Sequence, residues 1–146
     1  MLVRRFYDDR LAQASYLIGC QRTGEAIVID PPRDAAPIVA AARSEGVRIT
    51  RVTETHIHAD FVSGARELAA ATGAALLLSA EGGTDWQYAY AEEAGATLLR
   101  DGDTIEMGGV RLDVMHTPGH TPEHLAFIVT DRARSDEPVA MVSGDF

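Results

Sequence analysis

The sequence predicts an α/β domain in which helices cover one face of a β-sheet. Short apolar or alternating runs that are typical of strands recur along the 146 residues, and segments with helix signals lie between several of them. The composition agrees, because 46% hydrophobic and 24% charged residues are usual for a soluble globular protein. A chain of this length is expected to form one domain with a substantial core.

The predicted strands are short runs rich in aliphatic and β-branched side chains. Gly-rich breaks between several of them suit turns. The runs cover residues 14–20, 25–30, 48–55, 75–79, 109–116, 125–130 and 138–143.

Two segments carry helix signals at both ends. Asp34 is the expected N-cap of a helix that stops at Gly46. Asp60 is the expected N-cap of a second helix, whose apolar residues recur at i, i+3 spacing before Gly73. A third helix is predicted over residues 84–95.

The charge balance narrows the classes of partner. Thirteen Lys and Arg against 22 Asp and Glu give a formal net charge of −9, so neither a nucleic acid nor an anionic membrane is expected as a partner. The single cysteine, Cys20, fits a reducing compartment and is expected to be a buried apolar residue. Since no apolar run has the length of a signal peptide or a membrane span, a cytoplasmic location is expected.

All five histidines lie between positions 56 and 124, and the first two stand at the end of a predicted strand. In an extended backbone His56, His58 and Asp60 share one face, because alternate side chains point the same way about 6.5 to 7 Å apart. Two imidazoles and a carboxylate at a strand-to-helix junction suit zinc or iron. The alternative is that these residues form a solvated strand face and that Asp60 only caps the helix.

Two further groups each supply one candidate ligand. The tetrapeptide Thr117–His120 has Pro and Gly at its centre, which predicts a type II turn that holds His120 in a fixed direction. The last predicted strand is followed by Gly-Asp, which brings the Asp145 carboxylate to a strand end. His116 and His124 are expected to be structural histidines at strand ends or on the surface.

Together these groups resemble the signature of the metallo-β-lactamase superfamily: an H-x-H-x-D-H segment, a downstream His in a Pro-Gly-His turn, and an Asp that closes a strand. Within the superfamily, the sequence is most similar to persulfide dioxygenases and their rhodanese-fused relatives, and glyoxalase II is the nearest hydrolytic cousin. The similarity covers nearly the whole chain and implies the αβ/βα sandwich of two sheets flanked by helices. The motifs that carry it are Glu54-Thr55-His56-Ile57-His58-Ala59-Asp60, Thr117-Pro118-Gly119-His120-Thr121-Pro122-Glu123-His124 and Ser143-Gly144-Asp145-Phe146.

The resemblance to persulfide dioxygenases implies one Fe(II) ion held by His56, His120 and Asp145. Two histidines and a carboxylate on one face of the ion leave positions open for a thiolate and for oxygen. His58 and Asp60 then lie beside the ion, hydrogen-bond its water and orient its ligands. The implied reaction is the oxidation of a low-molecular-weight persulfide, such as glutathione persulfide, to sulfite and the parent thiol.

The resemblance to glyoxalase II implies a different use of the same residues. In that family His56, His58 and His120 correspond to the ligands of one zinc ion, Asp145 bridges to a second, and the D-H pair completes the second site. Here position 61 is Phe. Because an aromatic ring is no ligand, Phe61 favours a single-metal centre, and both Fe(II) and Zn(II) stay open.

The pattern of the family continues beyond the Asp that lies near the end of this sequence. We therefore expect one domain over residues 1–146 that holds the first half of the fold and the opening strands of the second. Sheet faces without their cover favour a homo-oligomer. An inactive metal-binding fragment remains an alternative to either enzyme.

Overall fold

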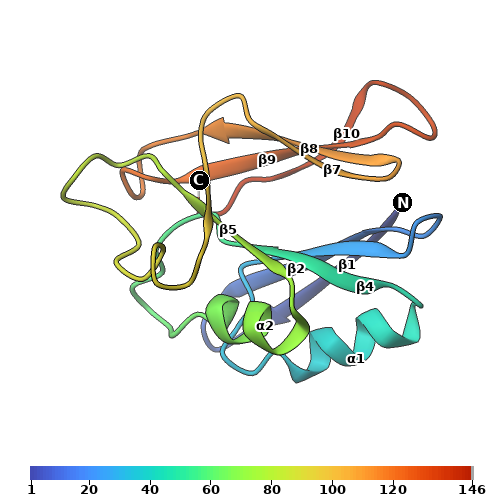
Figure 1. The fold of residues 1–146 in the computed structure, drawn as a ribbon, viewed down its shortest axis with the longest axis horizontal. Helices are drawn as coiled ribbons and strands as arrows, with labels where there is room; N and C mark the ends of the chain where they lie inside the picture. The colour runs from blue at the N-terminus through green and yellow to red at the C-terminus, as the bar shows by residue number, and fades with distance from the viewer. Residues whose placement is uncertain (146) are drawn as a thin grey trace.

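The computed structural model describes residues 1–145, which form three layers (Figure 1). Two helices lie against one face of a six-stranded sheet, and a four-stranded sheet lies against its other face. Residues 1–145 therefore supply one helical layer and both sheets of the predicted sandwich, which confirms the α/β fold class.

The first sheet begins antiparallel and becomes parallel after its third strand. Helix α1 (Ala36–Ser44) joins β3 to β4, and helix α2 (Ala65–Thr72) joins β4 to β5. In such a sheet the carboxyl ends of the parallel strands meet at one edge, where ligands usually bind. The strands, in spatial order, are β1 (Leu2–Asp8), β2 (Gln13–Cys20), β3 (Glu25–Ile29), β4 (Arg48–Thr53), β5 (Ala75–Ser79) and β6 (Thr97–Leu99).

The second sheet is antiparallel throughout. Its strands are β7 (Thr104–Met107), β8 (Val110–His116), β9 (Leu125–Asp131) and β10 (Pro138–Val142), in the spatial order β10-β9-β8-β7.

The central strands are apolar on both faces because each face meets another layer. In β3, Val28 packs toward α1 and α2, whereas Ile27 and Ile29 pack toward the second sheet. Phe127 of β9 fills the space between the sheets and is fully buried. Two apolar clusters thus hold the three layers together and give the edge of the sandwich a rigid base.

All seven predicted strands are confirmed, but three strands were not predicted and one predicted helix is wrong. The missed strands are β1, β6 and β7. Residues 84–95 form successive turns, in which Ala91 N–H donates to the Tyr88 carbonyl and Gly95 N–H to the Glu92 carbonyl. The prediction of a helix there is therefore wrong.

The region after β4 also differs from the prediction. Strand β4 ends at Thr53, so the extended backbone does not reach the histidines. Helix α2 begins at Ala65, whose N–H donates to the Ser63 hydroxyl at 3.0 Å, and Asp60 is not its N-cap. Residues 54–64 instead form an irregular segment that lies over the sheet edge.

The turn before His120 is not of type II. That turn type needs a positive φ at its third residue, and Gly119 does not have one. Within residues 1–145, no helix has both the length and the apolar character needed to cross a bilayer.

Candidate metal centre

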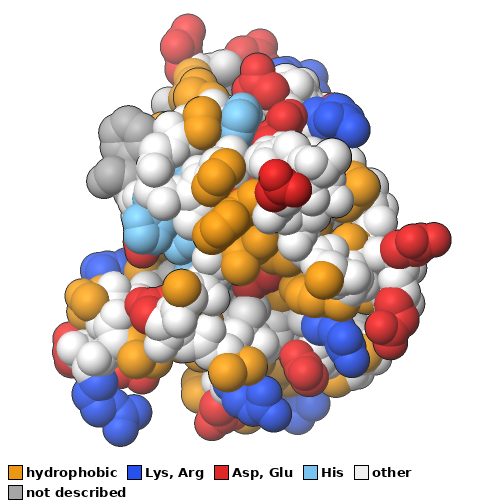
Figure 2. All heavy atoms as spheres, turned by 90° about the vertical axis from the view of Figure 1, so that its left-hand side faces the viewer, with side chains coloured by type: hydrophobic (Ala, Val, Ile, Leu, Met, Phe, Trp, Pro, Cys, Tyr) orange, Lys and Arg blue, Asp and Glu red, His pale blue; other side chains and the backbone are white. Residues whose placement is uncertain are grey.

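The candidate site lies at the edge of the sandwich where chain segments from both sheets meet (Figure 1). From the first sheet comes the irregular segment after β4. From the second sheet come the loop between β8 and β9 and the residues that follow β10. Figure 2 looks onto this edge, where histidine side chains reach the surface beside a group of hydrophobic side chains.

Three predicted ligands come together there. One ligand atom from each of His56, His120 and Asp145 lies within 4.8 Å of the other two. The Asp145 Oδ2 atom is 3.8 Å from His56 Nε2 and 3.7 Å from His120 Nε2. Ligand atoms around a shared ion at bond lengths near 2.1 Å lie about 3 to 3.5 Å apart. The two distances to Asp145 therefore need to shorten by less than about 1 Å, and the distance between the two histidine nitrogens by at most about 1.3 to 1.8 Å, to complete the site. The donor set suits iron or zinc.

The tautomer of His56 follows from its neighbours. The Thr55 hydroxyl donates its one proton to Asp30 Oδ2 at 2.8 Å, so its oxygen accepts the His56 Nδ1–H at 2.9 Å. This leaves the lone pair on Nε2, the atom that faces Asp145. Burial, together with the charge of His58, lowers the pKa of His56 to about 4, so the ring is neutral near pH 7, as a metal ligand must be.

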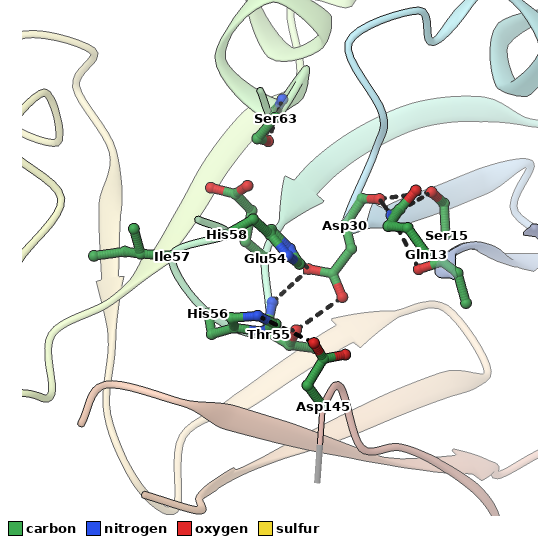
Figure 3. A network of polar contacts seen from close by, with 12 residues as sticks. Gln13, Ser15, Asp30, Glu54, Thr55, His56, Ile57, His58, Ser63 and Asp145 are labelled. Atoms are coloured by element: carbon green, nitrogen blue, oxygen red, sulfur yellow. Dashed lines mark hydrogen bonds and ion pairs between the residues drawn. The ribbon is translucent and has the colours of Figure 1, made fainter. Parts of the chain in front are cut away.

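Asp30 organises this edge and was not among the predicted site residues. The residue is only 3% exposed, and its carboxylate also accepts the Thr55 backbone N–H at 2.6 Å. Its own carbonyl accepts hydrogen bonds from Gln13 Nε2 at 2.7 Å and from the Ser15 hydroxyl at 2.6 Å (Figure 3). Asp30 therefore ties β2 to the segment that carries His56.

His58 and Asp60 lie outside the cluster of three. The His58 ring centroid is 4.1 Å from that of His56, but its Nε2 makes a hydrogen bond of 3.2 Å with Asp30 Oδ1. Burial lowers the pKa of His58, whereas the Asp30 carboxylate raises it, and the net change is upward. Asp60 is exposed. With His58 and Asp145, it lines a cavity of about 490 Å³.

The ring of Phe61 packs beside His58, with a distance of 4.4 Å between the ring centroids. Thus an apolar side chain lies where the H-x-H-x-D-H pattern has its last histidine.

Two more buried residues, His124 and Glu123, lie near the cluster of His56, His120 and Asp145. His124 directly precedes strand β9, as expected for a strand-end histidine, but it is buried rather than on the surface, with its ring centroid 5.2 Å from that of His56. Glu123 is fully buried, and its Oε1 accepts the Ile57 N–H at 2.6 Å. This bond fastens the β8–β9 loop to the histidine segment. The burial of Glu123 is not visible in the sequence, so no local signal marked it. His116 is a strand-end residue whose Nε2 faces the Pro122 carbonyl at 2.8 Å, as expected.

The match to a family model decides the relationship. The model for the metallo-beta-lactamase superfamily matches residues 8–132. The chain belongs to this superfamily.

Relatives within the metallo-β-lactamase superfamily include both hydrolases and persulfide dioxygenases. A hydroxyacylglutathione hydrolase of Polaromonas sp. is 36% identical over 99% of this chain and 51% of its own length. The human mitochondrial persulfide dioxygenase ETHE1 is 32% identical over 91% of this chain and 50% of its own length.

Among solved structures, a metallo-beta-lactamase from Staphylococcus aureus matches with a TM-score of 0.94 and 44% identity, over 99% of this chain and 43% of that one. The chain thus spans about half the length of the relatives it matches.

Proposed function

We propose that the chain forms a mononuclear Fe(II) centre of the persulfide dioxygenase type, with His56, His120 and Asp145 as its ligands. The substrate is a low-molecular-weight persulfide such as glutathione persulfide. With dioxygen and water it yields the parent thiol and sulfite. The observation that carries this proposal is the donor set: two histidines and one carboxylate within reach of one ion, with His58 turned to Asp30 and Phe61 beside it.

A ferrous ion held by His56, His120 and Asp145 would supply coordination positions for a thiolate and for oxygen. The chain's own residues prepare these positions. Thr55 and Asp30 fix the tautomer and direction of His56. Asp30 also holds His58, so that its ring faces the cavity that Asp145 and Asp60 line. We assign to His58 and Asp60 the role of orienting water and substrate in this cavity.

The direct test is oxygen consumption with glutathione persulfide by protein purified anaerobically. We expect uptake of one O₂ per persulfide, sulfite as the product, and loss of both in His120→Ala. Zinc at one ion per chain, together with no oxygen uptake, would overturn the proposal.

A second candidate is a Zn(II)-dependent thioester hydrolase of the glyoxalase II type. The observation that favours it is the higher identity to a hydroxyacylglutathione hydrolase, 36% against 32% for the persulfide dioxygenase. It predicts hydrolysis of S-lactoylglutathione at a rate that is the same with and without oxygen. The two functions are therefore separated by their dependence on oxygen.

A further inference from the structure

A second cavity, of about 440 Å³, lies next to the candidate metal centre. It is lined by Glu54, the segment 57–63, the first turn of α2 and the turns that contain Tyr88 and Tyr90. His58 and Phe61 line both this cavity and the one that holds Asp145. A small molecule bound at the metal centre therefore has this second cavity as its neighbour.

Two polar groups on the wall of this second cavity are buried without a partner. Glu54 is 2% exposed, and its Oε1 makes no well-aligned hydrogen bond among the described residues, although the Ser63 side chain lies close to the carboxyl. Its Oε2 accepts the Tyr90 hydroxyl at 3.2 Å. Tyr88 is 7% exposed, and its hydroxyl likewise lacks a partner within residues 1–145. An unsatisfied buried polar group costs about 1 to 3 kcal/mol, so two in one cavity indicate a missing ligand group.

The direction of Glu54 suits a ligand in this cavity. Its carboxylate points toward Ser63 and away from Asp145, on the far side of His58 from Asp30 (Figure 3). The side chain is thus an acceptor that a cation from outside would satisfy.

The rest of the wall favours a cation over an anion. Glu67 adds a second carboxylate, and Phe61 and Tyr90 add aromatic rings, whose faces attract cations. Arg66 is the only Lys or Arg among the lining residues that the structure describes, and its guanidinium already lies over the Tyr90 ring, 5.7 Å from the centroid. A ligand carboxylate would face Glu54 and Glu67, whereas a primary ammonium would be attracted by both.

We propose that this cavity binds the ammonium group of the small thiol compound whose sulfur lies at the metal centre, with Glu54 and Tyr88 as its partners. The assignment rests on the proposed function for the thiol, and it holds equally for a persulfide or a thioester of the same molecule. It makes Glu54 a specificity-determining residue for substrates with a free amino group.

The test measures binding without turnover. Glutathione and N-acetylglutathione differ in the amino group alone, and calorimetry on the metal-loaded protein gives both dissociation constants. We expect glutathione to bind the wild type at least about tenfold tighter, the effect of a charge-assisted hydrogen bond in a buried place. Glu54→Gln should remove this preference, and Tyr88→Phe should reduce it. Glu92→Gln changes an exposed carboxylate outside the cavity and should leave the preference unchanged.

Equal affinities for the two compounds in the wild type, or no binding of either, would overturn the assignment. So would a preference that survives both Glu54→Gln and Tyr88→Phe. Failure of the proposed dioxygenase function is seen separately, as selective binding of glutathione without oxygen uptake from its persulfide.

Discussion

Gly144 is the residue whose substitution tests most sharply how the backbone presents Asp145. Its φ is +59°, and a Cβ there would lie 2.5 Å from His124 Nε2 and 2.7 Å from Thr55 Oγ1. Ordinary contact begins at 3.4 Å, so the first distance is 0.9 Å too short. Because His124 and Thr55 are buried and hydrogen-bonded, we expect the 143–145 segment to move instead.

Gly144→Ala should therefore displace the Asp145 carboxylate by about 1 Å, well beyond the tolerance of about 0.2 Å for a metal–ligand bond. We predict metal binding on the order of 10- to 100-fold weaker, the usual effect of disturbing the support of a ligand. The positive φ adds a strain of about 1 to 3 kcal/mol. Competition with a chromophoric chelator measures the affinity, and urea unfolding of the apoprotein measures the strain.

Two glycines serve as matched controls. Gly73 has a φ of +69° but open space around a Cβ, so Gly73→Ala should cost stability and leave metal affinity unchanged. Gly119 has open space and no positive φ, although it adjoins His120, so Gly119→Ala should change neither. Wild-type metal affinity in Gly144→Ala, or an equal loss in Gly119→Ala, would refute the reasoning.

Three further predictions concern other residues. His120→Ala should abolish metal binding, because it removes a ligand. The His120 side chain is 49% exposed, so the same change should alter the free energy of unfolding of the apoprotein, measured in urea, by less than about 0.5 kcal/mol. A larger loss would mean that this side chain supports the fold. Glu123→Ala should lower the free energy of unfolding by about 2 to 3 kcal/mol, because the Ile57 N–H loses a buried charged acceptor. Glu123→Gln keeps an acceptor and should lower it less. Equal losses in the two variants would count against the hydrogen bond between Glu123 and Ile57. Burial raises the pKa of Cys20, but hydrogen bonds, first that from the Gly109 N–H, outweigh this and bring the pKa to about 7. The folded-state pKa lies below the unfolded value of about 8.5, so the thiolate stabilises the fold above pH 8.5, and this stabilisation is lost as the pH falls through 7. Cys20→Ala should therefore lower the free energy of unfolding by about 2 kcal/mol more at pH 9 than at pH 6. An equal loss at both pH values would contradict this.

The sequence predicted the strands that show a clear run or alternation of hydrophobic residues, and it missed the strands that show neither. The central strands β3 and β5 are continuous apolar runs, and such runs are visible in the sequence. Strands β6 and β7 have three and four residues, too few to show alternation. In β1 only Leu2 is buried and no alternation develops, so this strand is defined by its pairing with β2 rather than by a sequence pattern.

The predicted helix over 84–95 failed because longer-range contacts determine its conformation. Gly82 and Gly83, directly before this segment, have positive φ values. Within it, the Tyr90 hydroxyl donates a hydrogen bond to Glu54, which is 36 residues away in the sequence. Helical spacing of apolar residues did not contain this information. Instead, the segment forms one wall of the second cavity.

The candidate ligands of the ion were visible in the sequence, whereas the residues that orient them were not. His56, His120 and Asp145 stand in motifs of a few residues each, and the structure brings them together. Asp30 acts on Thr55 and His58 across 25 and 28 residues, and Glu123 acts on Ile57 across 66. Such contacts depend on the parallel pairing of β3 with β4 and on the packing of the two sheets, which no local pattern shows.

The number and identity of the metal ions in anaerobically purified protein test most directly the central claim that one ion is held by His56, His120 and Asp145. We predict one iron per chain in the wild type and none in Asp145→Ala. Two zinc ions per chain, or one ion that survives Asp145→Ala, would contradict this claim.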